Sequence, residues 1–120
     1  MDIFKTIADM KKEPGFAENV GMILIHNGIV RRWSRKDRST VEYVDVSPNI
    51  KKIESLRHEY SKKPGIYKIL IEARSGRFKP GDDLLFIVVA GDIRENVKPV
   101  LSDLLDRVKS EAIYKSEIMK

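Results

Sequence analysis

One stretch of the chain, residues 21–38 with the sequence GMILIHNGIVRRWSRKDR, changes character more abruptly than any other. Its apolar part, residues 22–25, must be buried, whereas the basic part after Gly28 must stay hydrated or meet an anion. Five basic residues and one acidic residue give positions 31–38 a net charge of +4, out of a formal +5 for the whole chain. The basic residues are Arg31, Arg32, Arg35, Lys36 and Arg38. A buried strand that carries arginines into a loop predicts a site for a negatively charged ligand.

The length and composition are typical of one globular domain. With 120 residues, 42% of them hydrophobic and 34% charged, we expect a single domain over residues 1–120 with a substantial core. The chain has no apolar run long enough to span a membrane and no continuous apolar segment of the secretory type near its start. It contains no cysteine, which excludes disulfides, thiolate nucleophiles and cysteine-ligated metals. We therefore expect a cytoplasmic protein without a membrane partner.

Hydrophobic periodicity predicts helices and strands in the order α-β-β-α-β-β-α. The predicted helices cover about residues 3–12, 48–63 and the region from 92 onward, and the predicted strands cover 20–27, 40–46, 66–73 and 84–90. The strand at 84–90 is apolar throughout and is predicted to be central in the sheet. This order favours an α+β domain: a largely antiparallel sheet with helices packed on it.

Two helix starts can be predicted from capping signals. Ser47 is the expected N-cap of the middle helix, with Pro48 in its first position. Residues 92–95 read D-x-x-E, a capping box for the last helix. Pro99 leaves two alternatives open. It either kinks a helix that begins at this box, or lies harmlessly in the first turn of a helix that begins at Asn96.

Histidines and acidic residues give little indication of chemistry. His26 is interpreted as a strand-end residue and His58 as a surface residue of a helix, because no second ligand stands at metal-binding spacing. We therefore expect no metal site. Motifs of hydrolases, P-loop proteins and dinucleotide-binding proteins are also missing.

Three basic features remain. Arg31 lies where the first strand ends, and Arg94 lies at a helix start, where free N–H groups favour an anion. Lys109 and Lys115 lie in the C-terminal tail beside apolar residues. A lysine held beside apolar groups and other cations has a lowered pKa and can act as an acid, base or nucleophile.

Together these residues resemble the large, catalytic subunit of molybdopterin synthase, the MoaE-like family. The resemblance covers residues 21–117 and rests on four motifs in order. They are a G-x-x-x-x-x-x-G-x-V-R strand and loop (Gly21, Gly28, Val30, Arg31), a G-x-x-x-P-G-D hairpin (Gly76, Pro80, Gly81, Asp82), the pair Ile93-Arg94, and a tail with Lys109 and Lys115-Ser116-Glu117. Histidines typical of the family are replaced by Ile93 and Ala73, and Lys115 comes one residue early.

The resemblance implies a fold, a reaction and partners. The fold would be that of the family's large subunit, which is α/β-hammerhead-like. The reaction would convert a cyclic pyranopterin monophosphate to molybdopterin, with sulfur from the C-terminal thiocarboxylate of a small ubiquitin-like carrier that ends in Gly-Gly. The large subunit would be a homodimer, and a heterotetramer with its carrier. No permanently bound cofactor is implied, because the cyclic pterin phosphate is the substrate.

The resemblance also implies residue roles. Lys109 and Lys115 would be the catalytic pair. The substrate-binding residues would be Ile29, Val30, Arg31, Ile93, Arg94, Ser116 and Glu117. We expect the two lysines and both arginines to converge on one pocket, within one chain or across a dimer interface.

An alternative of another class keeps the same scaffold without turnover. In a diverged paralogue, the basic residues 31–38 would bind an anionic partner or a nucleic acid, with Trp33 stacking on a base.

Overall fold

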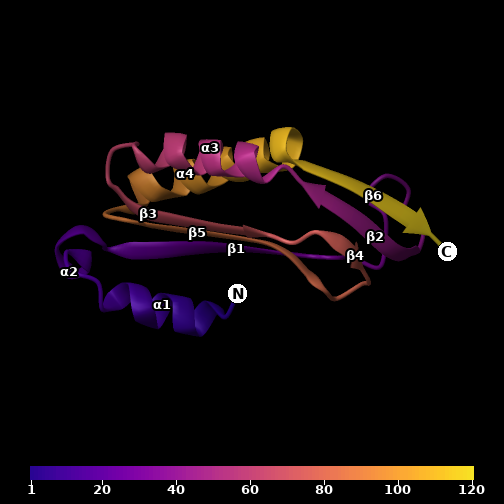
Figure 1. Cartoon of the computed structure of the whole chain (residues 1–120), viewed down its shortest axis with the longest axis horizontal. Coiled ribbons are helices and arrows are strands. Elements are labelled where there is room, and N and C mark those ends of the chain that lie inside the picture. Colours follow the sequence, from indigo (N-terminus) through magenta and orange to yellow (C-terminus); the bar gives the residue numbers. More distant parts are fainter.

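The computed structural model describes residues 1–120 and contains two three-stranded antiparallel sheets. The first sheet has the order β1-β5-β3, formed by β1 (Met22–Ile29), β5 (Asp83–Gly91) and β3 (Ile66–Ala73). Helices α3 (Ile50–Ser61) and α4 (Arg94–Arg107) cover one face of this sheet, and α1 (Ile3–Lys11) lies on the other (Figure 1). A short helix α2 (Phe16–Asn19) joins α1 to β1.

The second sheet has the order β4-β2-β6 and extends the molecule along its longest axis, which measures 50 Å (Figure 1). It consists of β4 (Gly76–Phe78), β2 (Val41–Pro48) and β6 (Ile113–Met119). A small separate core supports it, formed by Val30, Val41, Val44, Val46 and Phe78. The sequence did not predict β4 or β6, and it predicted one sheet where the structure has two.

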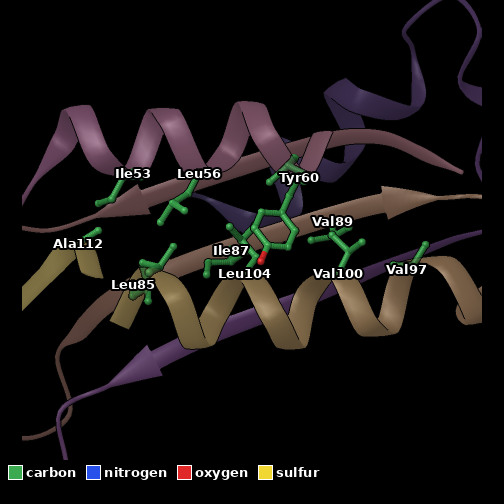
Figure 2. Packing of buried hydrophobic residues seen from close by; sticks show 12 residues of the cluster. Ile53, Leu56, Tyr60, Leu85, Ile87, Val89, Val97, Val100, Leu104 and Ala112 are labelled. Atoms are coloured by element: carbon green, nitrogen blue, oxygen red, sulfur yellow. The ribbon is translucent and has the colours of Figure 1, made fainter. Parts of the chain in front are cut away.

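The main core lies between the first sheet and the two helices that cover it. Figure 2 shows side chains of α3, α4 and β5 pointing toward one another in this layer, among them Leu56, Leu104 and Ile87. Leu104 and Ile87 are completely buried. The predicted α+β class, the bounds of β3 and the central place of β5 are confirmed.

The predicted start of the middle helix is wrong. Asn49, rather than Ser47, is the N-cap of α3, and its side-chain oxygen accepts a hydrogen bond from the Lys52 backbone N–H at 3.1 Å. Pro48 ends β2, where it pairs with Ile113 of β6. The pairing partner is more than sixty positions away in the chain, so local capping signals could not reveal that β2 continues through Pro48.

The predicted capping box at residues 92–95 is also wrong. Helix α4 begins at Arg94, and its N-cap, Ile93, makes no side-chain capping bond. The Asp92 carboxylate instead accepts hydrogen bonds from its neighbour's N–H, at 2.6 Å, and from the Asn96 amide, at 2.9 Å. Pro99 lies inside α4 beyond the first turn, where it cannot donate the usual backbone hydrogen bond.

None of the helices is both long and apolar enough to cross a membrane.

Candidate active site

A cavity of about 480 Å³ opens where the two sheets meet. Its walls come from β1, the loop after β1, β2, β5, β6 and the turn that precedes β6. The side chains that give it chemical character are His26, Ile29, Arg31, Arg35, Lys109 and Lys115. No carboxylate lines the cavity, and none of its four cations forms an ion pair. Unpaired cations gathered in one hollow favour an anionic ligand.

Lys109 is placed by an irregular turn at the end of α4. The helix stops at Arg107 and continues as a π-helical turn over Val108–Ala112, in which Val108 and Ala112 are buried. The Ala112 carbonyl accepts a hydrogen bond from the Asn49 N–H at 2.7 Å, which fixes the turn to the start of α3. Such π turns often occur at functional sites, because the wider turn redirects side chains. Here it leaves Lys109 exposed on the cavity wall.

Lys115 is placed by strand pairing. It lies opposite Val46 in the β2–β6 ladder, and both residues line the cavity. Burial against the cavity wall lowers the pKa of Lys115, although the residue keeps contact with solvent. The Glu117 carboxylate opposes this effect, and the charges of Arg31 and Lys109 add to it. The lowered pKa increases the fraction of Lys115 that is a free amine at neutral pH.

Arg31 is held by the hairpin that precedes β5. The backbone of the buried Val30 forms two 2.9 Å hydrogen bonds with this hairpin, donating to the Asp82 carbonyl and accepting from the Gly81 N–H. Gly81 has a φ of +96°, which favours glycine. The P-G-D motif of the sequence therefore fixes the base from which Arg31 enters the cavity.

The basic loop after β1 is anchored to β6 by a hydrogen bond. The buried Ser34 hydroxyl donates a 3.0 Å hydrogen bond to the Glu117 carboxylate of β6. The guanidinium groups of Arg31 and Arg38 lie 4.8 and 4.2 Å from the centre of the Trp33 ring. Trp33 therefore contacts two arginines of its own loop, and 39% of the residue stays exposed.

Of the residues predicted for the site, Ile29, Arg31, Lys109 and Lys115 line the cavity together. Val30 is buried behind it, and Ser116 and Glu117 lie in β6 beside it without lining it.

Ile93 and Arg94 do not join this cluster. The prediction that Arg31 and Arg94 converge on one pocket within one chain is therefore wrong. They lie at the opposite end of α4, whose 14 residues span about 20 Å. The Arg94 side chain is 82% exposed and pairs only with Glu95, at 3.5 Å. Convergence across a dimer interface stays a prediction.

His26 is the main cavity residue that the sequence interpretation missed. Its Nε2 atom is buried and has no hydrogen-bond partner. Burial, and secondarily the charge of Lys109, lowers the pKa of the imidazole. The sequence does place His26 two residues before Gly28, on the same face of the strand, which could have indicated a site residue. Only the structure shows that Lys109 lies beside that face. Arg35 also lines the cavity, and the sequence had placed it only in the basic loop.

Comparisons with known proteins identify the family and the fold, and they do not favour the nucleic-acid alternative. The family model described as MoaE protein matches residues 2–111. The fold is similar to that of a molybdopterin synthase from Staphylococcus aureus, with 24% identity, a TM-score of 0.73, and coverage of 84% of this chain and 76% of that one. A molybdopterin biosynthesis MoaE protein from Burkholderia ambifaria gives 21% identity, a TM-score of 0.76 and coverage of 96% and 75%.

A third similar structure is a complex of subunits 1 and 2 of the molybdopterin-converting factor from Helicobacter pylori. Its matching chain is 18% identical, with a TM-score of 0.72 and coverage of 99% of this chain and 80% of that one. A comparison with curated protein sequences finds no match. At these identities the structures establish the fold alone, whereas the family model covers most of the sequence. The chain belongs to the MoaE family, the family of the catalytic subunit of molybdopterin synthase, and functions in molybdenum cofactor biosynthesis.

Proposed function

We propose that this chain is a sulfur-transferring molybdopterin synthase subunit, which converts a cyclic pyranopterin monophosphate to molybdopterin. The observation that carries the proposal is the meeting of Arg31, Lys109 and Lys115 in one cavity, from three separate elements and without ion-pair partners. A phosphate-bearing substrate and an anionic thiocarboxylate both require cations, and every charged side chain that lines this cavity is a cation.

The cationic residues divide the work according to their chemistry. Arg31 carries a permanent, planar charge and binds the substrate phosphate. Lys115, whose pKa is lowered, transfers protons while the thiocarboxylate sulfur bonds to the substrate and water breaks the bond from that sulfur to the acyl carbon, which leaves on the carrier as a carboxylate. Lys109 remains exposed on the wall and stabilises negative charge that develops on the reacting groups. Neither step needs a cysteine, since the carrier brings the sulfur.

The partner follows from the same proposal. The donor of sulfur is a small ubiquitin-like carrier whose C-terminal Gly-Gly segment enters the cavity. The Helicobacter pylori relative was solved as a complex of two subunits, which supports a two-component enzyme.

The test mixes the purified chain with thiocarboxylated carrier and cyclic pterin monophosphate and measures dithiolene product. Lys115→Ala and Lys109→Ala should each reduce the rate about a hundredfold or more, the usual effect of losing a group that transfers protons or one that stabilises developing charge. Lys98→Ala removes an exposed lysine of α4 outside the cavity and should leave the rate unchanged. A correctly folded complex that forms no product would refute the proposal.

We also propose that the enzyme is a homodimer in which Arg94 acts on the partner copy's cavity. The place of Arg94, exposed and far from its own chain's cavity, motivates this. Arg94→Ala and Lys115→Ala chains, each inactive alone, should regain about a quarter of wild-type activity when unfolded together and refolded, because half of the dimers contain one intact site of two. If Arg94 acts within its own chain, or has no role, this recovery is not observed.

A further inference from the structure

His26 presents a buried nitrogen that the folded chain does not use. The residue lies on β1 opposite Ile87, and its side chain forms part of the cavity wall. Its Nε2 atom is closed to solvent and has no hydrogen-bond partner, and it is the only buried side-chain nitrogen or oxygen in that state in the whole chain. A buried polar atom without a partner destabilises the free protein, so such an atom calls for an explanation.

A glycine lies directly beside this nitrogen. Gly28 follows His26 on the same face of β1, and a Cβ atom at position 28 would stand 3.1 Å from Nε2. That distance is tighter than ordinary van der Waals contact, so any other residue at 28 would crowd the imidazole. Position 28 therefore has to be a glycine for the imidazole to keep this place in the cavity wall.

The charged groups that share the cavity with His26 are all cations. Arg31 and Arg35 come from the loop after β1, Lys109 from the π-helical turn, and Lys115 from β6. Burial first, and then the charge of Lys109, lowers the pKa of His26, so its imidazole is neutral near pH 7. A neutral imidazole offers one donor and one acceptor, unlike the four cations, which can only donate.

We propose that His26 is a substrate-contacting residue, whose imidazole turns toward the bound substrate and hydrogen-bonds through Nε2 to the pterin ring while the cations bind the phosphate. A pterin carries uncharged N–H and C=O groups along its edge, and the neutral imidazole is the cavity residue whose unused nitrogen suits them. The cations would recognise any phosphate, so His26 makes the cavity prefer a phosphate that carries a pterin. This inference rests on the proposed function, because it takes the cyclic pterin monophosphate as the ligand.

Calorimetry with the full-length chain tests the proposal. His26→Phe keeps a ring of similar size and removes the nitrogen, and it should weaken binding of cyclic pyranopterin monophosphate about tenfold, as expected for one lost hydrogen bond. His26→Gln retains a hydrogen-bonding group and should recover part of this loss. Binding of inorganic phosphate should be unchanged in both variants. His58→Phe changes the exposed histidine of α3 and serves as the matched control.

Two results would overturn the inference in different ways. If His26→Phe binds the pterin phosphate as tightly as wild type, His26 does not contact the substrate, and the proposed function stands. If the wild-type chain does not bind the pterin phosphate at all, the proposed function fails and the inference falls with it.

Nuclear magnetic resonance on the wild-type chain gives a test that needs no folded variant. The chain has only two histidines, so its imidazole ¹⁵N spectrum is simple. Adding the pterin phosphate should shift the Nε2 signal of His26 and leave the signals of His58 in place, whereas a purely structural His26 would keep its signal unchanged.

Discussion

Ser34 joins the basic loop to the last strand, and its removal should loosen the site. The residue is 1% exposed, and its hydroxyl donates a 3.0 Å hydrogen bond to the Glu117 carboxylate. The same oxygen accepts a weaker hydrogen bond from the Lys36 N–H at 3.3 Å. A hydrogen bond to a charged group contributes about 1.5–3 kcal/mol to stability. Because Glu117 is only half-buried and can regain water, we expect Ser34→Ala to lower the free energy of unfolding by about 1–2 kcal/mol.

Urea denaturation of four proteins measures this contribution. They are the wild type, Ser34→Ala, Glu117→Gln and the double variant, which together form a double-mutant cycle. The coupling free energy between the two positions should be about 1 kcal/mol, within the range for residues in direct contact. Ser110→Ala is the control, because that exposed hydroxyl bonds only to the Asp106 carbonyl of α4, four residues earlier in the chain. It should change stability by less than about 0.5 kcal/mol.

Removing the Ser34–Glu117 hydrogen bond should also weaken ligand binding in the cavity. The loop that Ser34 anchors carries Arg31, so Ser34→Ala should weaken binding of the pterin phosphate even though Ser34 does not line the cavity. Two outcomes would refute the reasoning: a coupling free energy near zero, or a Ser34→Ala variant that is no less stable than the Ser110→Ala control.

Two further predictions concern the core and the turn that carries Lys109. Leu104→Ala should lower the free energy of unfolding by about 3–5 kcal/mol, because the side chain is completely buried between α4 and the sheet; a loss below about 1 kcal/mol in urea denaturation would contradict the packing. Hydrogen bonds from Arg107 and then Lys52 lower the pKa of Glu111 from 4.5 to about 2, so its contribution to stability is complete above pH 4.5 and is lost as the pH falls toward 2. Melting temperatures measured across this interval should fall less steeply for Glu111→Gln than for wild type, and identical slopes would show that the ion pairs do not form.

The helices and strands that could be predicted from sequence are those that form because of the hydrophobic pattern of their own residues. Strand β3 has the bounds expected from its alternating pattern, and β5 is central as its unbroken apolar run indicated. In contrast, β6 has the sequence IYKSEIM, which mixes apolar and charged residues without a clear strand period. It becomes a strand because β2 offers a free edge, and that edge exists only after the chain has folded. The three-residue β4 depends on the other edge of β2 in the same way.

The site could be predicted in part for the same reason. Residue type and family resemblance indicated the basic residues, but which of them share a cavity depends on the fold. Arg31 and Lys109 meet because β1 and the end of α4 reach the same end of the first sheet. Arg94 opens the same helix that ends near Lys109, and the length of that helix keeps it away. The sequence could not indicate that Nε2 of His26 lacks a hydrogen-bond partner, because that depends on which groups the fold places near it.

Lys115 shares the cavity with Lys109 because of the way β6 pairs with β2. In the family's tail pattern this lysine comes one residue later, and along a strand a one-residue shift turns a side chain to the opposite face. Tyr114, the residue before Lys115, is 73% exposed and lines a separate groove together with Ser47. The side chains of Tyr114 and Lys115 therefore point to opposite faces of the strand. Lys115 nevertheless reaches the cavity, because β6 pairs with β2 so that Lys115 lies opposite Val46. The π-helical turn ends at Ala112, and β6 begins its pairing with β2 at the next residue. The register of β6 on β2, rather than the number of residues between Lys109 and Lys115, therefore brings the two amines together.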